Sequence, residues 1–210
     1  MHQRIDRDVG ADRIVAQLAY RYDGQFDRDR IDTLFHDSYD RLADTARVTV
    51  FLPTLAEKLT VQRLDALAQA DGKIAKRVPE ILFVCVGNAG RSQIAAALAR
   101  HHAGTRVHIR TAGSSPHEEI YPEVEQIMTD TGLSLAEEFP KPLTNEVLAA
   151  ADVVVTMGCG EHCPVLPGRR YEDWPIADPA GQPAARIRAI RDDIDHHVHA
   201  LLAELLPTSI

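Results

Sequence analysis

The segment at residues 81–86, Ile-Leu-Phe-Val-Cys-Val, most constrains how this 210-residue chain can fold. Such an uninterrupted apolar run is typical of a strand that is buried on both faces of a parallel sheet. It leads directly into a loop that contains Gly87 and Gly90, and a helical pattern follows at residues 92–102. A buried strand, a tight loop and a helix in direct succession predict an α/β fold.

The rest of the second half of the chain continues this alternation. We expect strands at residues 107–111, 152–157 and 170–174, and helices at residues 122–130, 144–150 and 184–206. Alternating strands and helices predict a four-stranded parallel sheet with helices on both faces. Binding and catalytic groups of such sheets gather beyond the carboxyl ends of the strands, so the loops there are the places to search for function.

The first 70 residues show helical periodicity alone. Apolar side chains recur at helical spacing in three segments, and Pro53 marks either a kink or a first turn. Because each apolar stripe needs a partner, we expect a small antiparallel three-helix bundle that serves as a structural or docking module. A polar, turn-rich stretch follows. The sequence therefore predicts a bundle at residues 1–72, a linker at 73–79 and an α/β domain at 80–210.

Charge and composition narrow the classes of function. The chain has 31 acidic and 23 basic residues, a net charge of −8, which argues against a nucleic-acid partner. No apolar run approaches the ~20 residues that span a bilayer, and the first residues lack the apolar core of a signal peptide, so we expect no membrane association. Three cysteines are too few for a disulfide scaffold, and they indicate a reducing, cytoplasmic setting in which thiols serve chemistry.

The loop after the first strand has the residues of an oxyanion site. Five residues separate Cys85 from an arginine, and the expected oxyanion-binding set is Val86, Gly87, Asn88, Ala89, Gly90, Arg91 and Ser92. Backbone N–H groups of a tight loop can converge on a tetrahedral anion, and the following helix N-terminus adds partial positive charge. The same field favours the nucleophilic thiolate of Cys85. Arg91 offers a planar fork of donors, and Ser92 can donate to the thiolate or cap the helix. A lone Cys85 would more often be a core residue, but the whole pattern favours the oxyanion site.

Residues 85–92 resemble the C-x5-R-S signature of the low-molecular-weight protein tyrosine phosphatase fold family, which directly follows the first strand. The resemblance covers residues 80–208. Within that family it is closer to the arsenate reductases, which typically carry glutamine after the Arg-Ser pair, as Gln93 does here, where the phosphatases usually carry proline. Ala89-Gly90 replace a frequent loop cysteine of the family, but that cysteine is not the nucleophile.

Cys159 and Cys163 lie in a glycine-rich loop after the strand expected at 152–157, on the same sheet edge as Cys85. Two interpretations compete. With His162 they could be zinc ligands, although a structural zinc site usually takes four. Alternatively they are redox partners, since cysteines four positions apart can be bridged if the turn deforms modestly. We favour the redox interpretation, and the loop is similar to the resolving segment of thioredoxin-coupled arsenate reductases.

Asp178 precedes Pro179 in a stretch that follows the last expected strand. By itself this pair is a common turn, but its position matches the Asp-Pro acid loop of the family. The resemblance therefore implies that Asp178 gives a proton to the leaving oxygen.

The histidines near the end of the chain, His196, His197 and His199, suggest a metal site at first sight. Neighbours on a helix point in different directions, so these rings do not easily share one metal. We expect them to be solvated or partly packed, and we assign no metal ligand and no cofactor.

The resemblance implies a cytoplasmic arsenate reductase. Cys85 would attack arsenate held by the loop and Arg91, while Asp178 protonates the departing oxygen. Cys159 would then attack Cys85 and release arsenite, and Cys163 would attack Cys159. The resulting Cys159–Cys163 disulfide is expected to be exposed for reduction by thioredoxin or a similar dithiol protein. Phosphate and sulfate would be weak ligands of the same loop.

Two other functions compete with this one. A protein tyrosine phosphatase would use Cys85, Arg91 and Asp178, but it has no use for the cysteine pair, and no tyrosine lies beside Asp178 in the sequence to line a phosphotyrosine slot. A sensor that binds arsenite or zinc through three thiols would not need the anion loop.

Overall fold

The computed structural model describes residues 2–46, 49–160 and 163–206, and the chain divides into two compact units, Met1–Ala75 and Lys76–Ile210. The first unit contains three helices, α1 (His2–Arg21), α2 (Arg28–Ala43) and α3 (Leu52–Ala70), as expected from the sequence. Pro53 stands in the first turn of α3, where its missing N–H costs nothing, so it causes no kink. No helix of the described residues is both long enough and apolar enough to cross a bilayer.

The helices of the first unit pack through their apolar stripes. Val15 and Leu18 of α1 and Ile31, Leu34 and Phe35 of α2 are all buried. The side chain of the residue before α2 caps the helix by accepting a hydrogen bond from a first-turn N–H at 2.7 Å. Spacing of the apolar side chains at three and four positions thus produces the bundle.

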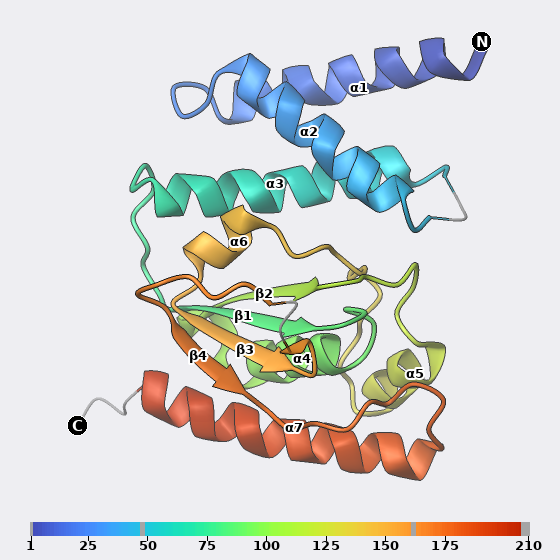
Figure 1. The fold of residues 1–210 in the computed structure, drawn as a ribbon, viewed down its shortest axis with the longest axis vertical. Helices are drawn as coiled ribbons and strands as arrows, with labels where there is room; N and C mark the ends of the chain where they lie inside the picture. The colour runs from blue at the N-terminus through green and yellow to red at the C-terminus, as the bar shows by residue number, and fades with distance from the viewer. Residues whose placement is uncertain (1, 47–48, 161–162, 207–210) are drawn as a thin grey trace. The chain divides into compact units, whose positions relative to one another are not determined.

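The second unit is the α/β domain that the sequence predicts. Its elements are β1 (Glu80–Cys85), α4 (Arg91–Ala103), the 3-10 turn η1 (Gly104–Arg106), β2 (His108–Gly113), α5 (Pro122–Asp130), α6 (Asn145–Ala150), β3 (Val153–Met157), β4 (Arg170–Asp173) and α7 (Ala184–Leu205). The strands form one sheet in the order β2-β1-β3-β4, and all three pairings are parallel. Figure 1 shows α4, α5 and α7 on one face of this sheet and α6 on the other.

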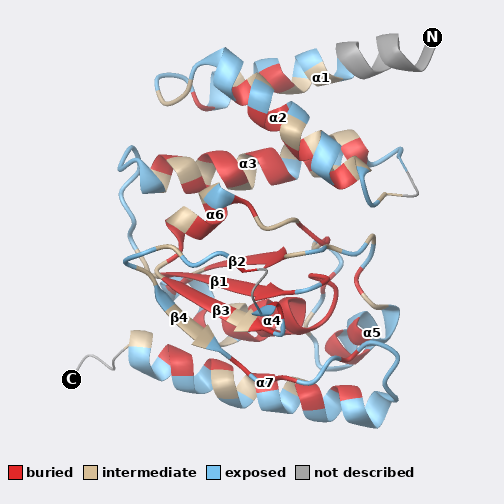
Figure 2. Ribbon diagram, viewed as in Figure 1, coloured by how far each residue is buried: buried red, intermediate tan, exposed pale blue. Residues whose placement is uncertain are grey.

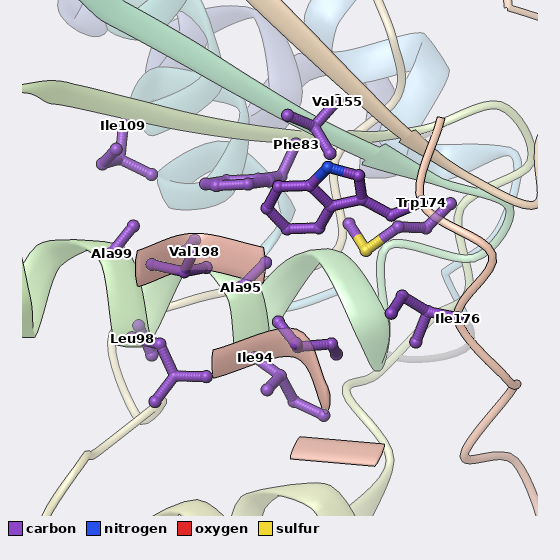
Figure 3. Close-up of a cluster of buried hydrophobic side chains, with 14 of the residues drawn as sticks. Phe83, Ile94, Ala95, Leu98, Ala99, Ile109, Val155, Trp174, Ile176 and Val198 are labelled. Atoms are coloured by element: carbon purple, nitrogen blue, oxygen red, sulfur yellow. The ribbon is translucent and has the colours of Figure 1, made fainter. Parts of the chain in front are cut away.

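The main core lies between the sheet and helices α4 and α7 (Figure 3). Every residue of β1 is buried, and residues 81–85 form the continuous apolar run that is typical of such a strand (Figure 2). Phe83 of β1 packs against Trp174 with ring centroids 5.7 Å apart, and Trp174 is only 4% exposed. Trp174 is therefore a core residue of the second unit.

The register of β1 brings three strand ends together. Cys85, its last residue, pairs with Gly113 at the end of β2 on one side and with Met157 at the end of β3 on the other. The loops that follow these strands therefore begin at a single edge of the sheet.

The opposite end of β1 is fixed by a buried ion pair. Glu80 Oε1 lies 2.6 Å from Arg110 Nε, and both side chains are at most 4% exposed. His108 Nδ1 lies 3.0 Å from the other carboxylate oxygen. Burial raises the pKa of Glu80, but the hydrogen bond of His108 and the charge and hydrogen bond of Arg110 outweigh it, so the pKa lies below its ordinary value. The carboxylate is thus held ionised between β1 and β2.

We predict that Arg110→Met destabilises the second unit by about 3–5 kcal/mol, because it leaves the Glu80 carboxylate buried without its main charge partner. Trp174, the single tryptophan, reports unfolding of this unit in urea. The folded pKa of Glu80 is lowered, so its contribution is complete above the unfolded pKa and is lost as the pH falls through the folded pKa. The variant and wild type should therefore begin to converge below about pH 4.3, the ordinary value for glutamate, and converge fully only below the folded pKa of Glu80.

Arg170→Met is the control, because Arg170 is exposed, its partner Glu172 is partly exposed and its partner Glu204 is exposed, so its loss should cost about 1 kcal/mol or less. Equal destabilisation by the two substitutions at pH 7 would contradict the importance given to the buried pair.

Candidate active site

The loop between β1 and α4 is built so that its backbone N–H groups face inward. N–H groups of the segment 114–121 donate to four carbonyl oxygens of the loop at 2.8 to 3.1 Å. The accepting residues are Cys85, Val86, Gly87 and Ala89. Because the C=O and N–H of a trans peptide point in opposite directions, the N–H groups of the same peptides face the inside of the loop. With the N-terminus of α4 they can bind a tetrahedral oxyanion.

Asn88 holds the shape of this loop. It adopts a left-handed conformation with φ 48°, which short polar residues tolerate better than most. Its Oδ1 accepts a hydrogen bond from the Lys141 N–H at 2.8 Å, and Gln93 Nε2 donates to its carbonyl oxygen at 3.0 Å. Its Nδ2 donates to Ser92 Oγ at 2.8 Å. Ser92 Oγ also lies 3.0 Å from Cys85 Sγ, and either of these two atoms can be the donor of the hydrogen bond between them.

Arg91 and Asp178 meet beside the loop. Arg91 is 8% exposed, and its Nη2 lies 2.6 Å from Asp178 Oδ2. The other Asp178 oxygen accepts a hydrogen bond from the Ala180 N–H at 3.0 Å, which orients the carboxylate. The structure therefore places Asp178 at the anion loop, in contact with the same guanidinium that could bind an oxyanion.

These groups surround a small cavity of about 60 Å³. Its walls are Cys85, Val86, Gly87, Ala89, Gly90, Arg91, His117, Tyr121 and Asp178. The rings of His117 and Tyr121 meet edge-on with centroids 5.3 Å apart. Burial, together with the negative charges of Asp178 and Cys85, raises the pKa of Tyr121, so its phenol stays protonated and can donate a hydrogen bond. The cavity has room for a small tetrahedral anion.

The sequence analysis does not identify His117 and Tyr121 as residues of the site. The position of Tyr121 also corrects the argument that was based on the tyrosines near Asp178. No tyrosine neighbours Asp178 in the sequence, but the loop after β2 brings Tyr121 to the same cavity as Asp178. The argument against a phosphatase from the absence of a tyrosine near Asp178 is therefore wrong, because Tyr121 lines the same cavity in the folded chain. The available signal was that this loop starts at the carboxyl end of β2, where sheet sites form.

Cys159 and Cys163 form a disulfide with a Cα–Cα distance of 5.9 Å, and Cys85 is a free, buried thiol. The expected pairing is confirmed. The expected exposure is wrong, because Cys159 is 2% and Cys163 9% exposed. His162, considered as a zinc ligand, lies outside the described residues. In this oxidised form neither cysteine offers a thiolate to a metal.

Comparisons with known proteins define the class of this chain. Residues 80–208 match the family described as low molecular weight phosphotyrosine protein phosphatase, and residues 11–68 match the protein-tyrosine-phosphatase-like N-terminal domain. The chain belongs to the low molecular weight phosphotyrosine protein phosphatase family. The resemblance inferred from residues 85–93 is thus confirmed.

Similarities to individual proteins are more specific than the family match. The structure of a Corynebacterium glutamicum thioredoxin-dependent arsenate reductase is 42% identical with a TM-score of 0.87, and the match covers 100% of both chains. Arsenate reductase 1 of Staphylococcus epidermidis is 32% identical over 118 residues, which cover 54% of this chain and 88% of that protein. The YwlE arginine phosphatase from Geobacillus stearothermophilus is 27% identical with a TM-score of 0.51, over 63% of this chain and 98% of that chain.

Gly158 lets the cysteine loop approach Arg91. It has φ +76°, and a Cβ there would lie 2.6 Å from Arg91 Nη1. We predict that Gly158→Ala displaces the guanidinium and weakens phosphate binding about 10- to 100-fold in calorimetric titration, since a hydrogen bond to a charged group is worth about 1.5–3 kcal/mol. Gly181→Ala is the matched control: φ is +65° but the space around it is open. Equal phosphate affinity in the two variants would exclude steric control of Arg91 by Gly158.

Proposed function

We propose that this protein reduces arsenate to arsenite and is regenerated by thioredoxin or a similar dithiol protein. The observation that carries this proposal is the Cys159–Cys163 disulfide in the loop next to Arg91, with Cys85 left as a free thiol. A phosphatase needs the anion loop but has no step for a second and third cysteine. The thioredoxin-dependent arsenate reductase that is similar over the whole chain supports the same conclusion.

The first step in this proposal is attack by the Cys85 thiolate on arsenic. Arsenate occupies the cavity, held by the inward N–H groups and by Arg91, and a sulfur–arsenic bond forms as an arsenic–oxygen bond breaks. Asp178 donates the proton that turns the departing oxygen into water or hydroxide. Phosphate and sulfate have the same tetrahedral shape, so they bind the loop as weak competing ligands.

The next steps transfer two electrons to arsenic. The Cys159 thiolate attacks Cys85 Sγ, and the electron pair of the sulfur–arsenic bond passes to arsenic, which leaves as arsenite. The Cys163 thiolate then attacks Cys159 Sγ, releasing the Cys85 thiolate and forming Cys159–Cys163. The dithiol protein reduces this disulfide and becomes oxidised itself, so atoms and electrons balance without a metal or organic cofactor.

The proposal also includes the cellular compartment of the protein and the roles of the different parts of the chain. The Cys85 thiolate must stay reduced between turnovers, so we place the protein in the cytoplasm. The chemistry is assigned to residues 80–210, because every residue named in it lies there, with residues 73–79 as a linker and residues 1–72 as a structural or docking module.

Single-turnover chemistry of the cysteine variants tests the proposal. We predict that Cys163→Ser releases one arsenite per chain and stops with a Cys85–Cys159 disulfide, which peptide mass mapping detects. Cys85→Ser should release none while still binding phosphate, because its loop N–H groups remain. Phosphate release from phenyl phosphate, measured in parallel, reports the phosphatase alternative. If the wild type hydrolysed phenyl phosphate but released no arsenite, the proposed function would be wrong and the phosphatase alternative would replace it.

Because Asp178 contacts Arg91, its substitution should change the rate of the first step and the affinity for phosphate in opposite directions. Asp178→Asn should slow the first step about 10²–10⁴-fold, because a positioned acid is lost. The same substitution should tighten phosphate binding by up to about fivefold, since a half-exposed ion pair that competes for Arg91, worth less than about 1 kcal/mol, is removed. Asp173→Asn, an equal change of charge outside the cavity, is the control. Weaker phosphate binding by Asp178→Asn would show that the carboxylate supports the anion site.

A further inference from the structure

A group of potential metal ligands lies at the end of α4 that is remote from the anion loop. His102 is one residue from the end of this helix, and Asp195 and His199 are one turn apart on α7, which packs against α4. One donor atom from each side chain lies within 4.8 Å of the others, the only such group of histidine, cysteine and carboxylate side chains among the described residues.

We propose that His102, Asp195 and His199 bind a divalent transition metal ion of the zinc class and thereby link α4 to α7. This site is additional to the proposed oxidoreductase function. His102 is eleven positions after Arg91 in α4, about 16 Å along the helix axis at ~1.5 Å per residue, so the metal would lie apart from the reacting thiols.

The distances suit a zinc ion after small side-chain rotations. Asp195 Oδ1 is 2.6 Å from His102 Nε2, and Asp195 Oδ2 is 3.9 Å from His199 Nε2. Ligands about 2.0–2.2 Å from a tetrahedral zinc ion lie about 3.4 Å apart, between these two values. The side chains of the three residues are 23%, 34% and 60% exposed, so water can supply the fourth ligand.

The charges also favour a cation. The imidazole rings of His102 and His199 lie 4.1 Å apart at their centroids, so two protonated rings would repel each other, whereas two neutral rings can share a metal. Asp195 supplies one negative charge, and the C-terminal end of α4 adds partial negative charge. Two imidazoles with one carboxylate form a ligand set suited to zinc, copper or nickel rather than to magnesium or calcium.

Other carboxylate–histidine pairs of the chain provide internal controls. Asp32 and His36 on α2 are also one turn apart, with 3.5 Å between Oδ2 and Nδ1. This pair resembles Asp195 and His199 but is not part of a three-ligand group in the described residues. If a carboxylate and a histidine one turn apart were enough to bind the metal, the pair on α2 and the pair on α7 would both bind it. If the third ligand is required, only the group on α4 and α7 would bind it.

The test is a calorimetric titration with Zn²⁺ of the full chain carrying Cys85→Ser, with Cys159–Cys163 oxidised so that no thiol competes. Visible absorption of Co²⁺ reports a tetrahedral site. We expect one ion per chain. Loss of a partner of a metal ligand alone weakens binding about 10–100-fold, so the ligand variants His102→Ala, Asp195→Asn and His199→Ala should each bind Zn²⁺ at least about tenfold more weakly. The control variants His36→Ala and His196→Ala should bind it with unchanged affinity.

Circular dichroism and Trp174 fluorescence establish that each variant is folded, and the exposed position of His199 makes its substitution the least disruptive. Zn²⁺ should also raise the Tm of the parent protein but not of folded His199→Ala. Absence of binding by the parent, or affinity that survives both His102→Ala and His199→Ala, would overturn the proposal and leave His102–Asp195 as an ordinary hydrogen bond.

Discussion

The parallel pairing of β1 with a strand on each side is the constraint on which the rest of the second unit depends. Because Cys85 is in register with Gly113 and Met157, the loops after β1, β2 and β3 all start at one edge. The first of these loops encircles the anion site, the second supplies Tyr121 and the third supplies the cysteine pair. A slip of one residue in either pairing would turn Cys85 to the other face of the sheet and separate these groups.

The sequence predicts the backbone of this site well because the relevant signals are local. A buried strand, glycines and a Cys-to-Arg spacing are adjacent in the chain, and each fixes its own conformation through sterics and through the field of the helix N-terminus. The cysteine pair is also local, since four positions separate Cys159 from Cys163. The element types and the parallel pairing of four strands are predicted correctly, with boundaries that differ by a few residues at most in the α/β unit.

What the sequence did not reveal depends on contacts between distant segments. Lys141 supports Asn88 through a backbone N–H, a role that its side-chain type does not signal. Tyr121 enters the cavity only through the path of the loop after β2. The histidines of α7 were considered as metal ligands with one another, whereas the structure pairs one of them with His102, which is far away in the chain. Tertiary packing, and not local pattern, decides these cases.

Burial of the Cys159–Cys163 disulfide bears on how electrons would enter the protein. A thiol–disulfide exchange requires the attacking sulfur to reach one sulfur of the bond in line, and at 2% exposure Cys159 offers no such approach. Cys163 is the more exposed of the two, and it is followed by Pro164 and the exposed Val165. A dithiol protein therefore has to attack Cys163 or wait until this loop opens. The first route leaves Cys159 as the released thiolate, which is the group that the next cycle of the proposed relay needs.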